Sequence, residues 1–311
     1  MLADGGPLGH DRHVLSDPTP ISFQESALLL IGHGSTKNED SVVSANFQAD
    51  LLRQLGVFGD SRAAFWKVEP KIDDVLDSMS QKNVHVVPFF LSEGYFTRQM
   101  LPEHFGFSSS QGGMYRGKEL IYCRPVGVHP KIEAIIDARI RSVLACEKAP
   151  EPGQTCLFLA AHGTEQNPHS AQFALAQAGR LSQKGVFGEV QTIFLDQAPY
   201  IRDWRTLTDR EQIAVIPLFL SDGLHVTDDI PELLGFKDNS DVAEFTLMAV
   251  GESSTPREGG KMNIPQFMMR KRLFGAKDLI VAKVENRTIW YARSLGREPM
   301  LANVILDLCL D

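Results

Sequence analysis

The chain contains two copies of one sequence pattern, and this duplication constrains its fold more than any other feature. His33 recurs as His162, 129 positions later, and the same offset relates many glycines, prolines and aromatic residues of the two copies. A constant register over so many turn and strand markers indicates two tandem domains rather than a solenoid of short repeats. The matched pairs are Gly56 with Gly185, Phe65 with Phe194, Pro70 with Pro199, Pro88 with Pro217, Pro102 with Pro231 and Gly106 with Gly235.

The register changes in the last part of the second copy. Tyr122 matches Tyr291 and Pro130 matches Pro299, and both of these pairs are 169 positions apart. The two offsets differ by 40 residues, so we expect an insertion of that length in the second copy, within about 237–285. A basic run in this segment is either a solvated face or a rim that contacts a substrate.

Short apolar runs alternate with segments of helical periodicity in both copies. This alternation predicts α/β domains, each with an open parallel sheet that is covered by helices on both faces. Right-handed crossovers place the loops that follow the strands on one edge of each sheet. We divide the chain into a flexible tail (1–26), a first domain (27–146), a linker (147–155) and a second domain (156–311).

Composition excludes several classes of protein. The formal net charge of −8 leaves no basic excess for a nucleic-acid partner. The four cysteines are scattered without a C-x-x-C pair, which is typical of buried thiols in a reducing cytoplasm. We expect no signal peptide and no membrane span, since the first residues lack an apolar core and no run of about 18 apolar residues occurs. The expected location is cytoplasmic.

Three polar residues of the second copy follow three of its predicted strands. His162, Asp196 and His225 should therefore meet at one edge of the sheet, where open α/β sheets bind ligands. Two imidazoles and a carboxylate are a plausible site for a divalent first-row metal ion, and the imidazoles can also accept protons near neutral pH. The alternative is that the three are structural polar groups satisfied by hydrogen bonds.

The first copy keeps one of these three residues. His33 remains, but Lys67 stands where the second copy has Asp196, and Phe96 stands where it has His225. We therefore expect the site of the first domain to be degenerate.

Other catalytic patterns are missing from the sequence. A histidine phosphatase needs an arginine directly before the histidine, but Gly32 and Ala161 occupy these positions. No Gly-x-Ser-x-Gly elbow and no glycine-rich nucleotide loop follows a strand.

Two motifs resemble those of the sirohydrochlorin chelatases, the CbiX/SirB-like class II chelatases. Residues 31–35 and 161–164 are similar to the family's Gly-His-Gly-Ser strand end, and residues 217–231 are similar to its Pro-Leu-Phe-Leu-x-x-Gly-x-His-x-x-x-Asp-Ile-Pro pattern. The resemblance covers both copies. It implies two tandem flavodoxin-like, chelatase-type domains related by a pseudo-twofold axis, with the active cleft between their strand-end edges. It also implies insertion of Co²⁺ or Fe²⁺ into sirohydrochlorin, on the route to cobalamin or siroheme.

The resemblance also assigns roles to residues. His162 and His225 are then metal ligands and proton acceptors, with Asp196 as their acidic partner, while His33 is a vestige or faces the metal from across the cleft. It implies no tightly bound cofactor, because the divalent metal (Co²⁺, Fe²⁺ or Ni²⁺) is a substrate. We expect a monomer whose two domains form an internal pseudo-dimer.

The expected partner is sirohydrochlorin or a related anionic tetrapyrrole, whose carboxylates need cationic anchors. A function of another class also fits the sequence, namely a metal or tetrapyrrole carrier that binds stoichiometrically without turnover. Each candidate anchor is otherwise a solvated surface charge. The candidate anchors are Lys37, Lys67, Arg98, Arg202, Arg270 and Arg272.

Overall fold

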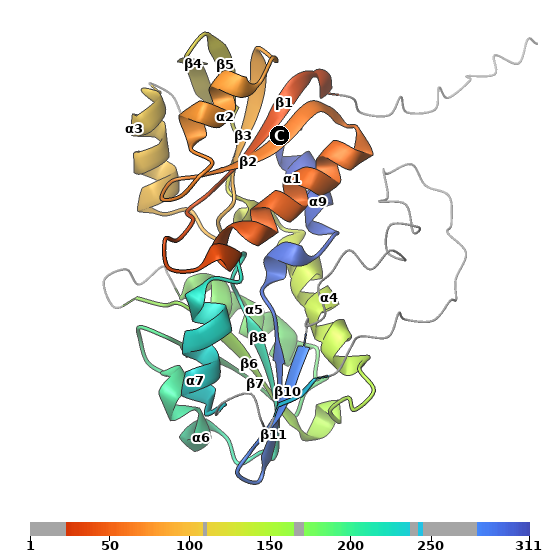
Figure 1. The fold of residues 1–311 in the computed structure, drawn as a ribbon. Coiled ribbons are helices and arrows are strands. Elements are labelled where there is room, and N and C mark those ends of the chain that lie inside the picture. Colours follow the sequence, from red (N-terminus) through yellow and green to blue (C-terminus); the bar gives the residue numbers. More distant parts are fainter. Residues whose placement is uncertain (1–22, 108–110, 165–170, 237–241, 245–278) are drawn as a thin grey trace, which may run out of the picture.

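The computed structural model contains two α/β units, each built around its own sheet, which lie one above the other in Figure 1. Within the described residues, no helix is long and apolar enough to cross a bilayer. The structure describes residues 23–107, 111–164, 171–236, 242–244 and 279–311.

The first sheet has the strand order β2-β1-β3-β5-β4. The first four of these strands run parallel, and β4 pairs with β5 as an antiparallel hairpin at the edge. The apolar centre of β1 is completely buried, as expected for a strand that is covered on both faces. The strands are β1 (Phe23–Gly32), β2 (Phe58–Phe65), β3 (Asn83–Pro88), β4 (Gly112–Tyr115) and β5 (Lys118–Tyr122).

The second sheet repeats this arrangement in the order β7-β6-β8-β11-β10-β9. Its β10–β11 hairpin corresponds to β4–β5 of the first sheet, and the short strand β9 adds one antiparallel partner at the edge. The strands are β6 (Thr155–Ala161), β7 (Glu189–Phe194), β8 (Gln212–Pro217), β9 (Val242–Glu244), β10 (Leu279–Val284) and β11 (Arg287–Ala292).

The sequence predicted two α/β units with parallel sheets, and this is confirmed. Two details differ. Strand β1 begins at Phe23, four residues before the predicted start and inside the predicted tail, because the Phe23 ring stacks on Phe58 with centroids 4.9 Å apart. The edge hairpins were not predicted, since β4 is a short strand with two glycines and lacks a strong apolar pattern.

The hairpins also locate the insertion more narrowly. Arg116 and Glu285 both have positive φ (50° and 59°) in the two hairpin turns, and they are 169 positions apart. The extra residues of the second copy therefore precede β10. The candidate anchors Arg270 and Arg272, and nearly all of this segment, lie outside the described residues, as do residues 1–22.

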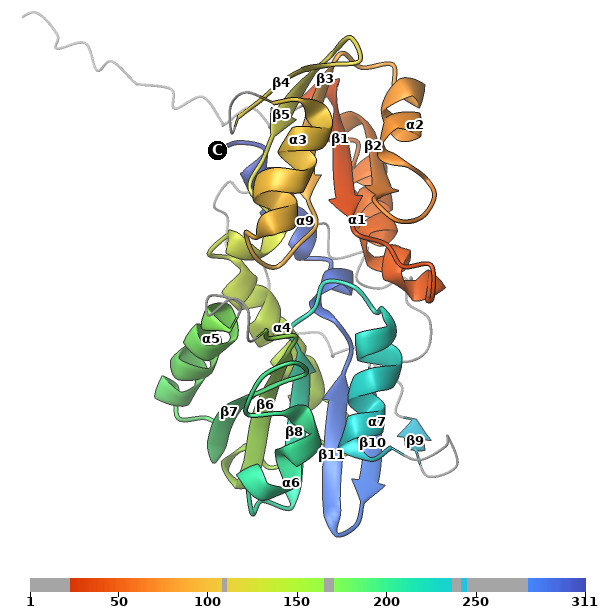
Figure 2. The same cartoon turned by 90° about the vertical axis from the view of Figure 1, so that its left-hand side faces the viewer.

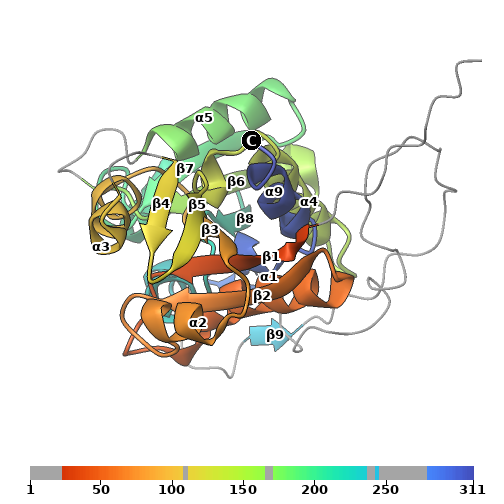
Figure 3. The same cartoon turned by 90° about the horizontal axis from the view of Figure 1, so that it is seen from above.

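Each unit supplies one helix to the other. Helix α4 belongs to the first sequence copy but packs against β8 and β11, whereas α9 belongs to the second copy and packs against α1. In Figure 1, α9 (blue) lies among the elements of the upper unit. Figures 2 and 3 show the same placement from two other directions. The helices are α1 (Val43–Leu55), α2 (Ile72–Ser78), α3 (Leu101–Phe105), α4 (Ile132–Leu144), α5 (Gln172–Gln183), α6 (Trp204–Leu207), α7 (Ile230–Leu234) and α9 (Leu301–Leu308).

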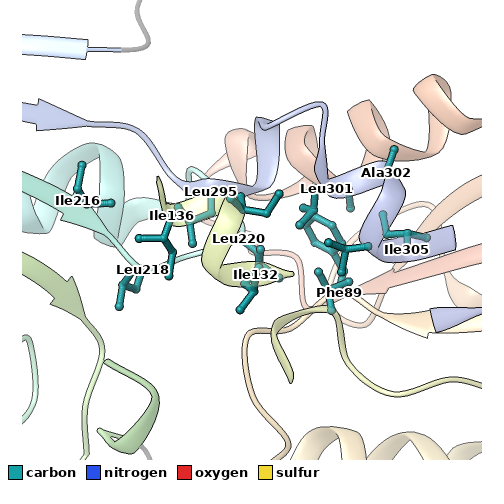
Figure 4. Packing of buried hydrophobic residues seen from close by; sticks show 14 of the residues in the cluster. Phe89, Ile132, Ile136, Ile216, Leu218, Leu220, Leu295, Leu301, Ala302 and Ile305 are labelled. Carbon is teal, nitrogen blue, oxygen red and sulfur yellow. The ribbon is translucent and has the colours of Figure 1, made fainter. Parts of the chain in front are cut away.

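The exchange joins the two units through one apolar core. Ile132 and Ile136 of α4 are in the same buried cluster as Leu301 and Ile305 of α9, and Figure 4 shows them in neighbouring parts of this cluster. Leu220, from the loop after β8, is also a member. The reciprocal exchange is what a twofold relation between two similar units produces.

Candidate active site

His162 directly follows β6, and the glycine after it sets the direction of the chain. Gly163 has φ of +69°, and a Cβ atom there would lie 2.6 Å from Cγ of Gln197. Both facts explain why the motif needs glycine. Nδ1 of His162 is 2.8 Å from the carbonyl oxygen of Gly163. Because a carbonyl only accepts hydrogen bonds, Nδ1 carries the proton and Nε2 keeps its lone pair.

His225 begins a π-helical turn, His225–Asp229, that follows the loop after β8. Its Nδ1 lies 2.6 Å from Oδ2 of Asp229. An ionised carboxylate only accepts, so Nδ1 donates and Nε2 is again the nitrogen with the free lone pair. Sequence reasoning included Asp229 in a motif but gave it no role. The i,i+4 spacing from His225 was the available signal.

Buried polar contacts fix the loop that leads to His225. Asp222 is completely buried, accepts a hydrogen bond from the backbone N–H of Ser294 (3.1 Å) and pairs with Nε of Arg297 (3.1 Å). The hydroxyl of Tyr291 donates to the carbonyl of Val226 at 2.7 Å, and burial raises the pKa of this phenol. The partners lie about 70 residues away in sequence, so sequence reasoning missed them.

The two imidazoles of the second unit face each other. Their ring centroids are 5.0 Å apart and their planes are nearly perpendicular, at 85°. Oδ2 of Asp196 lies 3.4 Å from Nδ1 of His162. About half of each imidazole side chain is exposed (51% for His162 and 47% for His225), so a ligand can reach both. The structure therefore brings together the three residues that the sequence pattern selected.

The equivalent position in the first unit is apolar. The ring of Phe96 packs edge-on against His33 (centroids 5.6 Å apart) and against Trp66 (5.4 Å). Nδ1 of His33 is 3.1 Å from the carbonyl oxygen of Gly34, the same contact that His162 makes. Partial burial, and secondly the positive charge of Lys67, lower the pKa of His33.

One cavity of about 970 Å³ lies between the strand ends of the two units. Its lysines come from the first copy and its imidazoles from both copies, and its apolar walls include several phenylalanines and leucines. Among the described residues, the ammonium groups of Lys37 and Lys67 have no carboxylate partner. The lining includes His33, Lys37, Lys67, Phe89, Phe90, His162, Phe173, Leu218, Phe219, Leu220, His225 and Asp229.

Two other predicted anchors lie elsewhere. Arg98 pairs with Glu93 and lines an adjoining cavity of about 750 Å³, which shares Leu91, Ser92 and Phe173 with the first. The guanidinium of Arg202 stacks over the ring of Tyr200, 3.8 Å from its centroid. The structure does not bring either residue into the cavity of the histidines.

The model of the CbiX family matches residues 27–143 and 156–310, which is most of the chain. A curated relative from Halobacterium salinarum, named a probable sirohydrochlorin cobaltochelatase, is 33% identical over 301 residues. This match covers 92% of the present chain and 91% of the relative. The chain belongs to the CbiX family.

Solved structures resemble this CbiX-family chain in fold. A Deinococcus radiodurans protein, described as similar to chelatases with two additional novel domains, superposes with a TM-score of 0.61 at 23% identity. That match covers 91% of the present chain but 54% of the other chain, which is longer. SirB from Bacillus subtilis with Fe³⁺ superposes with a TM-score of 0.57 at 16% identity over 92% and 94% of the two chains. Tandem chelatase-type units are thus the fold of this protein, as the sequence predicted.

Proposed function

We propose that this CbiX-family protein is a chelatase, a lyase that inserts Co²⁺ or Fe²⁺ into sirohydrochlorin. The observation that carries the proposal is the pair His162 and His225, whose ring centroids are 5.0 Å apart and which line a cavity shared by both units. The name of the Halobacterium relative, at 33% identity over nearly the full length, supports sirohydrochlorin and cobalt as the substrates.

The two imidazoles suit the chemistry of metal insertion. Both have Nδ1 hydrogen-bonded to an oxygen, so both offer the Nε2 lone pair to a metal ion or a proton. Two nitrogen ligands leave most of the coordination sphere open, and the ion can therefore pass to the ring nitrogens. Insertion also releases two pyrrole N–H protons, which neutral imidazoles accept near pH 7.

The two carboxylates act through the histidines. Asp229 and Asp196 both lie on the Nδ1 side of an imidazole, at 2.6 Å and 3.4 Å. A carboxylate that accepts the Nδ1 proton, as Asp229 does from His225, orients the ring, and a nearby carboxylate such as Asp196 adds negative charge beside the ion. We infer that Asp196 positions His162 and offsets the charge of the ion.

The first unit forms the wall that receives the tetrapyrrole. Sirohydrochlorin has many carboxylates and a flat apolar ring, and the cavity offers Lys37 and Lys67 together with apolar surfaces such as Phe89 and Phe90. With Phe96 packed against His33, the described residues of this unit place no second imidazole beside His33. His33 faces the shared cavity and is the third imidazole available there.

We also propose that the protein acts as a monomer, in which sequence units 27–146 and 156–311 take the places of two subunits. The exchanged helices α4 and α9 support this proposal, because they provide within one chain the reciprocal contacts that a symmetric dimer needs.

The test is the absorption change of sirohydrochlorin on metallation, followed with a large excess of sirohydrochlorin and Co²⁺ or Fe²⁺ over protein. A chelatase forms many equivalents of metallated product per chain, faster than the uncatalysed control. A product yield that stops at one equivalent per chain would instead indicate the carrier function, and our proposal would be wrong.

A further inference from the structure

Three potential metal ligands form a buried cluster away from the cavity. His85 lies on β3, Cys123 directly follows β5, and Cys309 directly follows α9. One donor atom from each residue lies within 4.8 Å of the other two. The three residues are only 5%, 7% and 8% exposed. The cluster therefore joins the exchanged helix α9 to the sheet of the first unit.

The second unit provides an internal comparison for this cluster. Each of the three residues has an equivalent position in the other sequence copy. The offset of 129 makes Ala214 the equivalent of His85, and the offset of 169 makes Ala292 the equivalent of Cys123 and Ile140 the equivalent of Cys309. All three of these counterparts are buried members of the main apolar core, and Ile140 lies on the exchanged helix α4. An ordinary apolar contact thus suffices at this position, whereas the first unit has three ligand-type side chains.

The environment of His85 also points to a ligand. Its Nδ1 atom is buried and has no hydrogen-bond partner among the residues that the structure describes. The rings of Phe23 and Phe58 flank the imidazole, with centroids at 4.9 Å and 5.8 Å. A buried polar atom without a hydrogen-bond partner is destabilising, so an imidazole in an aromatic pocket is unfavourable unless something binds it. Apolar packing alone does not explain its presence.

We propose that His85, Cys123 and Cys309 bind a transition-metal ion of borderline or soft character, with Zn²⁺ as the best match. Thiolate sulfur and imidazole nitrogen are the ligands that such ions prefer, and hard ions such as Mg²⁺ avoid them. Binding releases the two thiol protons to solvent, and a water molecule completes a tetrahedral site. The ion would fasten α9, and with it the second unit, to the first sheet. This site does not depend on the proposed chelatase function.

Co²⁺ provides the test, because cobalt–thiolate bonds absorb in the near ultraviolet and cobalt–imidazole bonds alone do not. The protein is the full chain, purified under reducing conditions, stripped of metal, and carrying His162→Ala and His225→Ala to remove the other metal-binding pair. We expect a sulfur-to-cobalt charge-transfer band that saturates at about one equivalent. The double variant Cys123→Ser/Cys309→Ser, which has no thiol left in the cluster, should abolish the band, whereas Cys146→Ser, at a half-buried cysteine outside the cluster, should retain it.

A second measurement keeps the proposal testable if a cysteine variant does not fold. Added Zn²⁺ should raise the unfolding temperature of the stripped protein and of Cys146→Ser, but not that of His85→Gln. The proposal is overturned if no charge-transfer band forms, or if the band persists in Cys123→Ser/Cys309→Ser. It is also overturned if thiol titration of the denatured, unreduced protein finds two of the four cysteines joined in a disulfide.

Discussion

Nδ1 of His225 lies 2.6 Å from Oδ2 of Asp229, one turn later in the same π-helical segment. This hydrogen bond determines which imidazole nitrogen is free and holds the ring in the position that faces His162. The equivalent turn of the first unit, Phe96–Met100, is also π-helical. The turn therefore belongs to the repeated fold, and the pair His225 and Asp229 is what distinguishes the second site.

Replacing Asp229 tests that relationship. Asp229→Asn removes the negative charge that stabilises a metal-bound or protonated His225, so we expect kcat for sirohydrochlorin metallation to fall about 10–100-fold. The matched control is Asp228→Asn, at the neighbouring carboxylate, which contacts Thr227 rather than the histidine. Equal rates for Asp229→Asn and the unmodified protein would show that the carboxylate has no role in the reaction.

The charge of Lys67 gives two independent predictions from one variant. Lys67→Ala removes a cation from the cavity, so we expect KM for sirohydrochlorin to rise about two- to fivefold, as for one exposed ion pair. Because the Lys67 charge lowers the pKa of His33, the same variant should raise that pKa, measured by NMR titration of the imidazole. Lys82→Ala, at an exposed lysine outside the cavity, should change neither quantity. An unchanged KM with Lys67→Ala would exclude it as an anchor.

Two substitutions should give the first unit a metal-binding site like that of the second unit. Phe96→His together with Lys67→Asp gives this unit the residues found at the second site, beside the existing His33. We expect the double variant to bind one more equivalent of Co²⁺ than the unmodified protein in equilibrium dialysis, since the paired imidazoles would lie at a similar separation. Phe96→Leu with Lys67→Asp is the control without a new imidazole. No additional equivalent would mean that the two units differ in more than these residues.

The helix exchange predicts that the two units unfold together. Ile305→Ala removes a completely buried side chain of α9, and should lower the free energy of unfolding by about 2–5 kcal/mol. Urea unfolding can be followed with Trp66 in the first unit or Trp204 in the second as the reporting tryptophan, with the other tryptophans replaced. Both reporters should show the same loss, while Leu310→Ala, at an exposed residue nearby, should change stability by less than about 0.5 kcal/mol. A loss seen by only one reporter would contradict a joint core.

The sequence alone was sufficient to predict the features that repeat in the two copies and those that follow from local hydrophobic periodicity. The offset of 129 aligned His33 with His162 and exposed the change from Phe96 to His225, so the selection of the two histidines needed no structure. The helix exchange could not be predicted, because periodicity shows that α4 has an apolar face but does not show which sheet that face packs against. The roles of Asp222 and Asp229 depend on buried long-range contacts and on a π-helical turn, which periodicity does not indicate.

We expect His162 and His225 of the second unit to handle the metal ion and the pyrrole protons, while the first unit binds the tetrapyrrole. The most direct measurement compares initial rates of sirohydrochlorin metallation for three proteins: the unmodified chain, His162→Ala/His225→Ala, and His33→Ala. Loss of the ligand and base pair should lower kcat/KM by at least about 100-fold, whereas His33→Ala, the matching change in the first unit, should lower it less than tenfold. Full activity in the double variant, or a greater loss with His33→Ala, would contradict the account.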